Sequence, residues 1–255
     1  GGGFASCALA RLITDLGHRA VILELSDALG GMARSLKKEG MTYEHGPHIL
    51  ADHACSQKVI NFILRYINVV ETTVESATFL QKQFLSYPPN RNDFVHLKEH
   101  VAIEYELKHL PIEPNTRNFE SYLVSKVGKS VYELYYKHFT EKFWQINPKK
   151  LSTSWAKMRH LGENLDDSHM FFNKTWCAYP KNDFNELFTN ISRGIEVQYK
   201  TKIVGIDMEK GVVIDARGNS YSGDLIVSTV GIDTLCGYAF GKLDYAGYEI
   251  EPVVI

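Results

Sequence analysis

Glycines and one glutamate near the start of the sequence have the residue types and spacing that bind a dinucleotide. Gly1 and Gly3 directly precede an apolar stretch. At such a turn, backbone N–H groups approach a diphosphate at the N-terminus of a helix, where the helix dipole favours an anion. Glu24 follows about 20 residues later, where a carboxylate accepts hydrogen bonds from ribose hydroxyls. The spacing predicts a dinucleotide-binding β-α-β unit.

A second glycine pair, Gly30-Gly31, narrows the choice of dinucleotide. In flavoproteins of the glutathione-reductase type, a glycine pair after the acidic residue lets the chain pass close to the diphosphate, and Arg34 can add positive charge there. The combination favours FAD over NAD. Two simpler interpretations stay open: the first glycines can be an expression remnant or a flexible end, and Glu24 can be an ordinary surface residue.

The hydrophobic pattern predicts the elements that must hold these residues. Residues 4–16 have helical periodicity that stops at Gly17, and residues 56–68 form a second amphipathic helix. Residues 19–25 are a short β-branched and apolar run, typical of a strand that is buried on both faces. A helix and a strand of this kind after a glycine turn fit a nucleotide-binding unit.

The middle of the chain has a different character. Strand-like pieces between residues 78 and 90 close with a Pro-Pro-Asn turn. Two helices rich in Tyr and Phe are predicted over residues 119–127 and 129–140, with Gly128 between them. After Pro180, a helix over residues 183–192 precedes strands, which we expect over the following ranges: 196–208, 211–216 and, as a buried strand, 225–229.

These patterns predict an α/β fold, namely a Rossmann-like FAD-binding domain with an inserted helical subdomain and a small antiparallel sheet. We expect a discontinuous nucleotide domain made of residues 1–75 and 190–255. Residues 76–189 then form a substrate-binding insertion, whose helical subdomain covers residues 115–165.

Composition excludes several classes of function. Lys and Arg number 28 against 30 Asp and Glu, with a net charge of -2, so a nucleic-acid-binding surface is not expected. The sequence has no C-x-x-C pair, so neither a metal site nor a disulfide framework is predicted, and a reducing cytoplasm fits best. The four cysteines lie far apart: Cys7, Cys55, Cys177 and Cys236.

No apolar run approaches the roughly 20 residues that span a bilayer. A membrane span is therefore not expected, and association into a homo-oligomer is left open. A nucleotide-binding unit normally begins with a strand before its glycine turn, so we expect the sequence to be a fragment that lacks this strand and a C-terminal portion.

Several blocks of sequence, in the same order, resemble the UDP-galactopyranose mutase family. GGMARS (residues 30–35) and YEHGPHIL (residues 43–50) are similar to the GGNAY and YGPHIF blocks of that family, which places His48 at the histidine beside the flavin ring. Residues 118–144 resemble the family's helical substrate segment, which ends in Y-T-x-K-Q-W. Residues 232–251 resemble its block I-D-x-x-F-x-Y-x-x-G-x-L-x-Y-R-S-L-x-F-E.

The resemblance implies a redox-neutral isomerisation of a UDP-sugar between its pyranose and furanose forms, which uses reduced FAD and supplies precursors of cell-surface polysaccharides. It implies catalytic positions for His48 and Trp144. Phe139 takes the place of the tyrosine that stacks on uracil, and Tyr135 and Asn90 match other substrate-binding positions. For Phe139 and Tyr135, packing in a helical core is an equally strong interpretation, because aromatic residues four positions apart often form core.

Two positions depart from the family pattern. An arginine of a mobile loop, which grips the substrate diphosphate, should fall near Gly162, and the nearest candidates are Arg159 and His160, two or three residues earlier. The arginine of the block Y-R-S-L is replaced by Ala246. Each lost hydrogen bond to the charged diphosphate would cost roughly 1.5–3 kcal/mol of binding free energy.

Two other functions are kept as alternatives. An FAD-dependent amine oxidase or a protoporphyrinogen-oxidase-like oxidoreductase shares the glycine turn, the GG-x-A-R-S stretch and a W-x-I-x-P segment, here residues 144–148. Arg34 favours this alternative slightly. The second alternative is a catalytically inactive remnant that serves as a binding module.

Overall fold

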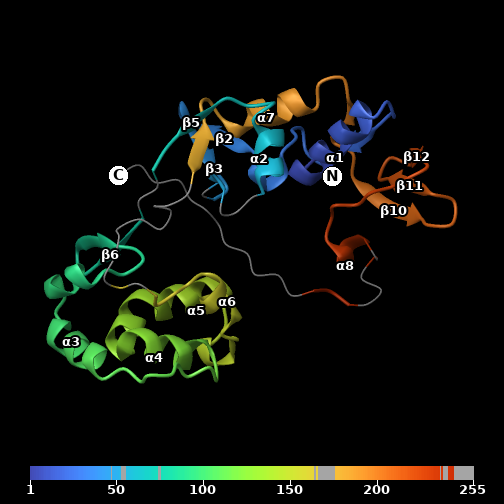
Figure 1. The fold of residues 1–255 in the computed structure, drawn as a ribbon. Coiled ribbons are helices and arrows are strands. Elements are labelled where there is room, and N and C mark those ends of the chain that lie inside the picture. Colours follow the sequence, from blue (N-terminus) through green and yellow to red (C-terminus); the bar gives the residue numbers. More distant parts are fainter. Residues whose placement is uncertain are drawn as a thin grey trace. The chain divides into compact units, whose positions relative to one another are not determined.

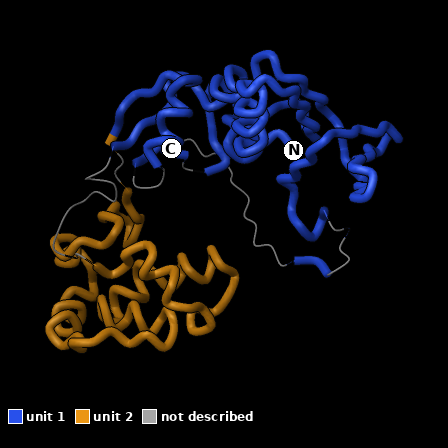
Figure 2. The backbone as a smooth tube through the Cα atoms, turned by 45° about the vertical axis from the view of Figure 1, so that its right-hand side comes forward, with its two compact units in different colours: residues 1–72, 176–245, 249–255 blue, residues 73–175, 246–248 orange. Residues whose placement is uncertain are grey.

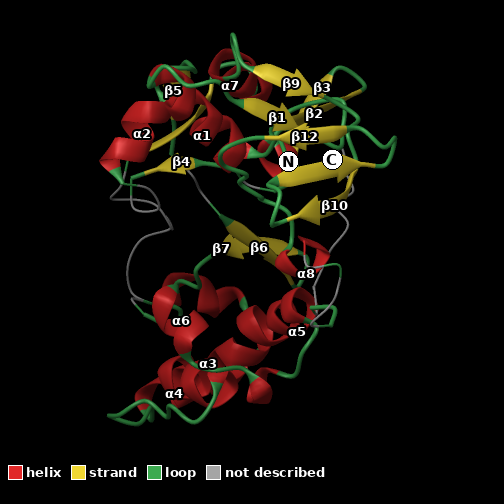
Figure 3. Cartoon of the chain, turned by 90° about the vertical axis from the view of Figure 1, so that its right-hand side faces the viewer, coloured by secondary structure: helices red, strands yellow, loops and turns green. Residues whose placement is uncertain are grey.

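The computed structural model describes residues 1–46, 48–52, 56–73, 76–163, 165, 176–235, 237 and 241–243. The chain divides into two compact units (Figure 2). Unit 1 comprises Gly1–Thr72, Trp176–Tyr245 and Glu249–Ile255, and unit 2 comprises Thr73–Thr175 and Ala246–Tyr248. Unit 1 mixes strands with helices, whereas most of unit 2 is helical (Figure 3).

Unit 1 begins with the expected helix and strand. Helix α1 (Phe4–Asp15) starts directly after Gly3, and its chain continues into strand β1 (Val21–Leu23). Strand β1 pairs in parallel with β9 (Glu196–Gln198), with Ile22 opposite Val197. The turn, the helix and the parallel strand thus follow one another as in a nucleotide-binding unit.

Two strands that the sequence predicted to be buried are not buried. Around β1, Ile22 is 4% exposed, but Val21 is 41% and Leu25 is 63% exposed. Residues 225–229 form no strand, and Leu225 is 72% exposed. Among the described residues, only β9 pairs with β1, and no strand pairs with residues 225–229, so neither segment gains the second neighbour that buries a central strand.

Short antiparallel pairs complete the strands of unit 1. The first pair is β2 with β3, the second sheet has the order β4-β8-β5, and the third has the order β10-β11-β12. Their bounds are β2 (Ser35–Lys38), β3 (Met41–Glu44), β4 (Leu50–Ala51), β5 (Val69–Glu71), β8 (Cys177–Pro180), β10 (Ile203–Asp207), β11 (Val212–Asp215) and β12 (Ser220–Ser222). The remaining helical elements of unit 1, apart from α7, are the 3-10 turn η1 (Gly31–Ala33), α2 (Gln57–Ile63) and α8 (Ile232–Leu235).

Helix α7 (Phe184–Ile191) supplies much of the core of unit 1. It packs against α1 (Figure 1). Its apolar face is almost completely buried, through Phe184, Leu187, Phe188 and Ile191. The division expected from the sequence placed residues 176–189 in the insertion, whereas the structure places β8 and α7 in unit 1, because this apolar face packs with the core residues of α1 and β1.

A small network of hydrogen bonds joins β2 to the start of α7. The Ser35 N–H donates to Asn185 Oδ1 at 3.1 Å, and Asn185 Nδ2 donates to the Ser35 carbonyl at 2.9 Å. The Phe184 N–H in turn donates to Ser35 Oγ at 3.0 Å. Ser35 is 5% exposed, so its backbone groups depend on these partners.

Replacing Asn185 with Ala is expected to lower the free energy of unfolding by about 2 kcal/mol, because two buried backbone groups lose their partner. Urea unfolding measures the change. Asn182→Ala is the matched control, since exposed Asn182 precedes the helix and its side chain donates only to half-buried Glu186. Equal losses from the two variants would show that the buried bonds contribute nothing specific.

Unit 2 is a helical subdomain with one hairpin. The hairpin is formed by β6 (Ala77–Leu80) and β7 (Gln83–Ser86). The helical elements are η2 (Arg91–His96), α3 (His100–Lys108), α4 (Phe119–Val131), the π-helical turn η3 (Tyr132–Lys137), α5 (His138–Trp144), η4 (Pro148–Lys150) and α6 (Ser154–Met158). The core lies between α3, α4, η3 and α6, with Ile103, Leu123, Val127 and Ala156 fully buried.

The break predicted at Gly128 is a kink inside α4. Gly128 has φ 81° and ψ 164°, a conformation that residues with a side chain rarely adopt. A side chain there would also meet Glu106, whose carboxylate accepts hydrogen bonds from the Ser130 N–H at 2.8 Å and from its hydroxyl at 3.0 Å. Glu106 thereby binds the backbone that follows the kink. None of the helices formed by the described residues is long and apolar enough to cross a membrane.

Candidate functional site

Gly2 is the centre of the glycine turn, although the sequence predicted roles only for Gly1 and Gly3. Its N–H donates to the Glu24 carboxylate, and its carbonyl accepts from the Gly30 N–H at 2.8 Å and from the thiol of Cys7 at 3.3 Å. Gly3 and Gly30 also form a parallel β-bridge. The structure therefore brings the first glycines, the acid and the second glycine pair together.

Close packing explains why glycine is needed at two of these positions. A Cβ atom on Gly2 would lie 2.5 Å from Leu29, and one on Gly30 would lie 2.6 Å from the Phe188 ring. Gly30 also has φ 108°. Around Gly3, by contrast, a Cβ atom would meet nothing within 4 Å. Side chains therefore pack closely against Gly2 and Gly30, whereas the space around Gly3 is open. That open space lies at the N-terminus of α1, where an anion would be bound.

Glu24 is held in place by backbone groups. Its N–H donates to the Gln198 carbonyl at 2.9 Å, and its carbonyl accepts from the Thr201 N–H at 2.8 Å. Its carboxylate accepts from the N–H groups of Gly2 and Ser26, the latter at 2.7 Å. Partial burial by itself would raise the pKa of Glu24, but the hydrogen bonds from Ser26 and Gly2 outweigh it and lower the pKa. The group is a fixed carboxylate with further acceptor capacity.

The residues of unit 1 fit an adenine dinucleotide. The open space at Gly3 leaves room for a diphosphate at the N-terminus of α1, and Glu24 directly follows β1 beside that turn, where it can accept from ribose hydroxyls. Gly31 has φ 55° and lies against Gly3, which keeps the second glycine pair close to the same space. Arg34 ends the turn η1 and has no ion pair with any described residue.

His48 follows strand β3 and lies beside Glu44. Its N–H donates to Glu44 Oε2 at 3.3 Å, and its Nδ1 lies 3.7 Å from the same oxygen. The ring packs edge-on against Phe184 at a centroid distance of 6.1 Å. Burial raises the pKa of Glu44, which the His48 N–H and the charge of a protonated His48 oppose. The role of His48 beside a flavin stays a prediction.

Unit 2 holds an aromatic cluster at the end of α5. Phe139 and Phe143 are stacked at a centroid distance of 5.5 Å, and Phe143 is nearly parallel to Trp155 at 6.3 Å. Trp144 packs edge-on against both Phe143 and Trp155. The guanidinium of Arg159 lies over Trp155, 4.8 Å from the ring centroid. The cluster joins a cation to several aromatic faces, a combination that suits a nucleotide.

Within this cluster, Phe139 is 55% exposed and offers a ring face to solvent. The indole N–H of Trp144 is buried without a hydrogen-bond partner among the described residues, which leaves it free to donate to a ligand. Phe143 and Trp155 were not predicted from the sequence. The spacing of four between Phe139 and Phe143 is a signal that could have found Phe143, whereas Trp155 joins the cluster only through the fold of α6.

Tyr135 and Asn90 are both buried and contact other residues of unit 2. Tyr135 is 5% exposed, and its ring packs against Phe94 in the core of unit 2, as the interpretation of a helical core expected. Burial raises the pKa of its hydroxyl. Asn90 is 3% exposed and caps η2, where its Oδ1 accepts from the Asn92 N–H at 2.8 Å. Their substrate-binding roles stay predictions.

The predicted site residues thus fall into two groups. Gly1, Gly3, Glu24, Gly30, Gly31, Arg34 and His48 belong to unit 1, and Asn90, Tyr135, Phe139, Trp144 and Arg159 belong to unit 2. Ala246 lies outside the described residues, as do the last residues of the block 232–251. In the described part of the chain, no three His, Cys, Asp or Glu side chains gather as a metal site would require.

Two family models match the chain. Residues 1–66 match a model of the NAD(P)-binding Rossmann-like domain, and residues 134–255 match the model of UDP-galactopyranose mutase. Together they cover the glycine turn and the aromatic helix.

Known proteins resemble the chain over most of its length. A probable UDP-galactopyranose mutase of Klebsiella pneumoniae is 25% identical over 98% of the chain, and a dTDP-fucopyranose mutase of Escherichia coli is 23% identical over 98% of it. The chain spans 64% and 67% of the lengths of these relatives.

Solved structures show the same fold. A crystal structure of reduced UDP-galactopyranose mutase superposes with a TM-score of 0.71 at 23% identity, covering 92% of the chain and 55% of that structure. A putative protoporphyrinogen oxidase from Exiguobacterium is more distant, with a TM-score of 0.59 at 15% identity over 86% of the chain and 56% of that structure. The predicted α/β fold with a Rossmann-like domain is confirmed. The chain is therefore similar to the UDP-galactopyranose mutase family over most of its length, with an FAD-binding Rossmann-like unit.

Proposed function

We propose that this protein interconverts the pyranose and furanose forms of a UDP-sugar with reduced FAD. The observation that carries the proposal is the match of residues 134–255 to the mutase model, since these residues include the exposed aromatic face of α5. The Gly2–Glu24–Gly30 arrangement of unit 1 supports the cofactor. We place the reaction in the cytoplasm, in the synthesis of precursors for cell-surface polysaccharides.

The residues of unit 1 would hold the cofactor. The open space at Gly3 leaves room for the diphosphate at the start of α1, and Gly1 would contribute its backbone to the same turn. Glu24 accepts from ribose hydroxyls, and Arg34 adds a positive charge after Gly31. When bound, reduced FAD supplies the electron-rich centre that a redox-neutral isomerisation of this kind requires. The chain's part is to bind and orient the reacting groups.

The residues of unit 2 would hold the substrate. The exposed face of Phe139 stacks on the uracil base, and the free indole N–H of Trp144 donates to an oxygen of the nucleotide sugar. Arg159 provides a guanidinium for the diphosphate, and its contact with the Trp155 ring orients that group. Phe143 holds Phe139 in place through their stacked rings.

Two measurements on the purified protein test this function. The absorption spectrum shows whether the protein takes up FAD, because a colourless preparation that does not bind added FAD contradicts every flavoenzyme assignment. Incubating the reduced protein with UDP-galactofuranose and separating the products by chromatography then tests the reaction. We expect UDP-galactopyranose to appear without consumption of an oxidant. If only another nucleotide sugar is converted, the assignment to UDP-galactose is wrong.

An FAD-dependent amine oxidase or protoporphyrinogen-oxidase-like enzyme is the second candidate. Arg34 and the segment of residues 144–148 favour it, because both fit the patterns of those oxidases. Such an enzyme reduces its flavin with substrate and consumes oxygen, whereas the mutase needs a flavin that is already reduced. Oxygen uptake with candidate amines separates the two. A protein that binds FAD but shows neither reaction would be an inactive binding module, the third candidate.

Replacing Phe139 with Ala is expected to raise the KM for the nucleotide sugar about tenfold, because stacking of an aromatic side chain on a base contributes about 1–3 kcal/mol. Initial rates at several substrate concentrations measure KM and kcat. Phe79→Ala is the control, since Phe79 is 62% exposed on the hairpin of the same unit and lies outside the aromatic cluster. A fall in kcat with unchanged KM would contradict a role in base stacking.

A further inference from the structure

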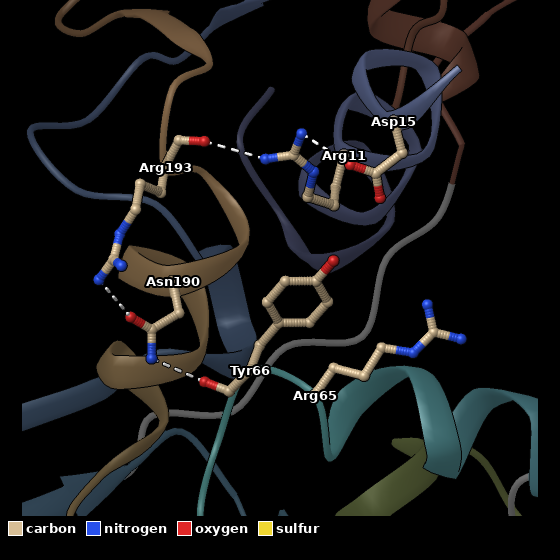
Figure 4. A pocket seen from close by; sticks show the side chains of 6 residues that line it. All are labelled: Arg11, Asp15, Arg65, Tyr66, Asn190 and Arg193. Carbon is tan, nitrogen blue, oxygen red and sulfur yellow. Dashed lines mark hydrogen bonds and ion pairs between the residues drawn. The ribbon is translucent and has the colours of Figure 1, made fainter. Parts of the chain in front are cut away.

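A polar hollow lies in unit 1, at the opposite end of α1 from the glycine turn. It has a volume of about 560 Å³ and is open to solvent. We call it the arginine hollow (Figure 4). Its lining residues are Arg11, Asp15, Arg65, Tyr66, Asn190 and Arg193. None of them belongs to the proposed cofactor or substrate sites.

Three helices contribute to the arginine hollow with their C-terminal ends. Arg11 and Asp15 come from the last turns of α1, Arg65 and Tyr66 follow α2, and Asn190 and Arg193 lie at the end of α7. Residues that are distant in sequence thus form one surface.

Hydrogen bonds fix the walls of the hollow. Arg11 forms an ion pair with Asp15 at 2.8 Å and donates to the Arg193 carbonyl at 2.9 Å. Asn190 donates to the Tyr66 carbonyl at 2.7 Å and accepts from the Arg193 guanidinium at 3.3 Å. These bonds join all three helix ends.

The charges in the hollow are not balanced. Three arginines and one aspartate line the hollow, and the aspartate carboxylate is already paired with Arg11. Within the part of the chain that the structure describes, neither Arg65 nor Arg193 has a carboxylate partner. The Nε of Arg11 is buried and has no hydrogen-bond partner there either. Buried donors of this kind normally bind a protein group or another acceptor.

The positions of the arginines at helix ends do not by themselves explain the cluster. A cation near a helix C-terminus interacts favourably with the helix dipole, which suits each arginine separately. Arg11 indeed donates to a carbonyl at the end of α7. The Arg65 guanidinium, however, donates to no described residue and points away from the Tyr66 ring, on the side opposite to Arg193 (Figure 4). These donors remain available to a ligand.

We propose that the arginine hollow binds a phosphate-bearing anion. Guanidinium groups offer paired N–H donors that match the oxygens of a phosphate, and a tyrosine hydroxyl adds a further donor. Arg65, Tyr66 and Arg193 would contact the anion. Arg11, which lines the hollow, would add to the positive charge around it. The same phosphate chemistry occurs in small diphosphates and in the headgroups of anionic phospholipids, and the experiment has an arm for each source.

In the first arm, the FAD-saturated protein is titrated with inorganic pyrophosphate at constant ionic strength, and isothermal calorimetry measures the affinity. We expect Arg65→Gln and Arg193→Gln each to weaken binding about tenfold, which corresponds to about 1.4 kcal/mol, because each variant loses a charged hydrogen bond to the anion. Both arginines are exposed, so the variants should unfold at the same temperature as the unmodified protein without pyrophosphate.

Arg117→Gln is the matched control, because it removes the same charge from an exposed position in unit 2. It should bind pyrophosphate like the unmodified protein. The second arm measures co-sedimentation with vesicles of phosphatidylglycerol and with vesicles of phosphatidylcholine. Retention only by phosphatidylglycerol, lost in Arg65→Gln, would assign the phosphate to a lipid headgroup.

Two outcomes would overturn the proposal. One is that neither pyrophosphate nor phosphatidylglycerol binds. The other is that binding is equal in Arg65→Gln, Arg193→Gln and Arg117→Gln, which would place it elsewhere or make it dependent on net charge alone. Lower unfolding temperatures of Arg65→Gln and Arg193→Gln without any change in binding would show that these arginines only stabilise the helix ends.

Discussion

Gly30→Ala is expected to lower the free energy of unfolding by about 3 kcal/mol, from two causes that act together. The new Cβ atom would lie 2.6 Å from the Phe188 ring, and overpacking of this kind costs about 1–3 kcal/mol. Gly30 also has φ 108°, where a side chain adds a backbone cost of about 1–2 kcal/mol. Urea unfolding followed by circular dichroism measures the loss.

Gly17→Ala separates the two causes. Gly17 has φ 86°, but a Cβ atom there would meet nothing within 4 Å. Its substitution should therefore show only the backbone cost, about 1 kcal/mol. If the two variants lose the same stability, the contact with Phe188 is unimportant and α7 does not hold the second glycine pair in position.

Helices and strands of this fold could be predicted from the sequence when their formation depends only on their own residues. The apolar periodicity of residues 4–16 and 183–192 found α1 and α7, because an amphipathic helix carries its pattern in its own residues. The burial of strands could not be predicted in the same way. An apolar run such as residues 225–229 predicts a buried strand, but burial depends on which neighbours pair with it, and those lie elsewhere in the sequence.

Some residues of the candidate site could likewise be predicted from the sequence, whereas others could be found only in the folded chain. Glu24 and the glycine pairs were found by spacing, because a dinucleotide imposes fixed distances along the chain. Gly2 was missed, since its role depends on contacts with Leu29 and Glu24 that only the folded chain makes. Trp155 was missed for the same reason, because α6 brings it to the aromatic cluster from outside the helix that carries Phe139.

Glu24→Gln is expected to weaken FAD binding at least tenfold and to lower the free energy of unfolding by about 2 kcal/mol. The carboxylate accepts from the N–H groups of Gly2 and Ser26 with its two oxygens, whereas an amide has one oxygen and turns its NH2 group toward the other donor. A lost hydrogen bond to a charged group costs about 1.5–3 kcal/mol. Absorbance after gel filtration measures retained FAD, and urea unfolding without FAD measures stability.

Glu209→Gln is the control for this substitution, because Glu209 is an exposed glutamate of the same unit. It should retain FAD and unfold like the unmodified protein. A Glu24→Gln protein that keeps its FAD but loses stability would restrict Glu24 to a structural role in the turn. The converse result, lost FAD at unchanged stability, would assign the carboxylate to the ligand alone.

The pH dependence of stability gives an independent test of Glu24. Because the pKa of Glu24 is lowered in the folded state from its ordinary value of 4.5, the carboxylate contributes stability that is fully present above that value. This contribution is lost as the pH falls through the lower, folded-state pKa, where the carboxylate takes up a proton. The stability difference between the unmodified protein and Glu24→Gln should therefore be constant at neutral pH and shrink below pH 4.5. A difference that grows on acidification would mean that Glu24 is destabilised as an anion, and that the hydrogen bonds from Gly2 and Ser26 do not outweigh its burial.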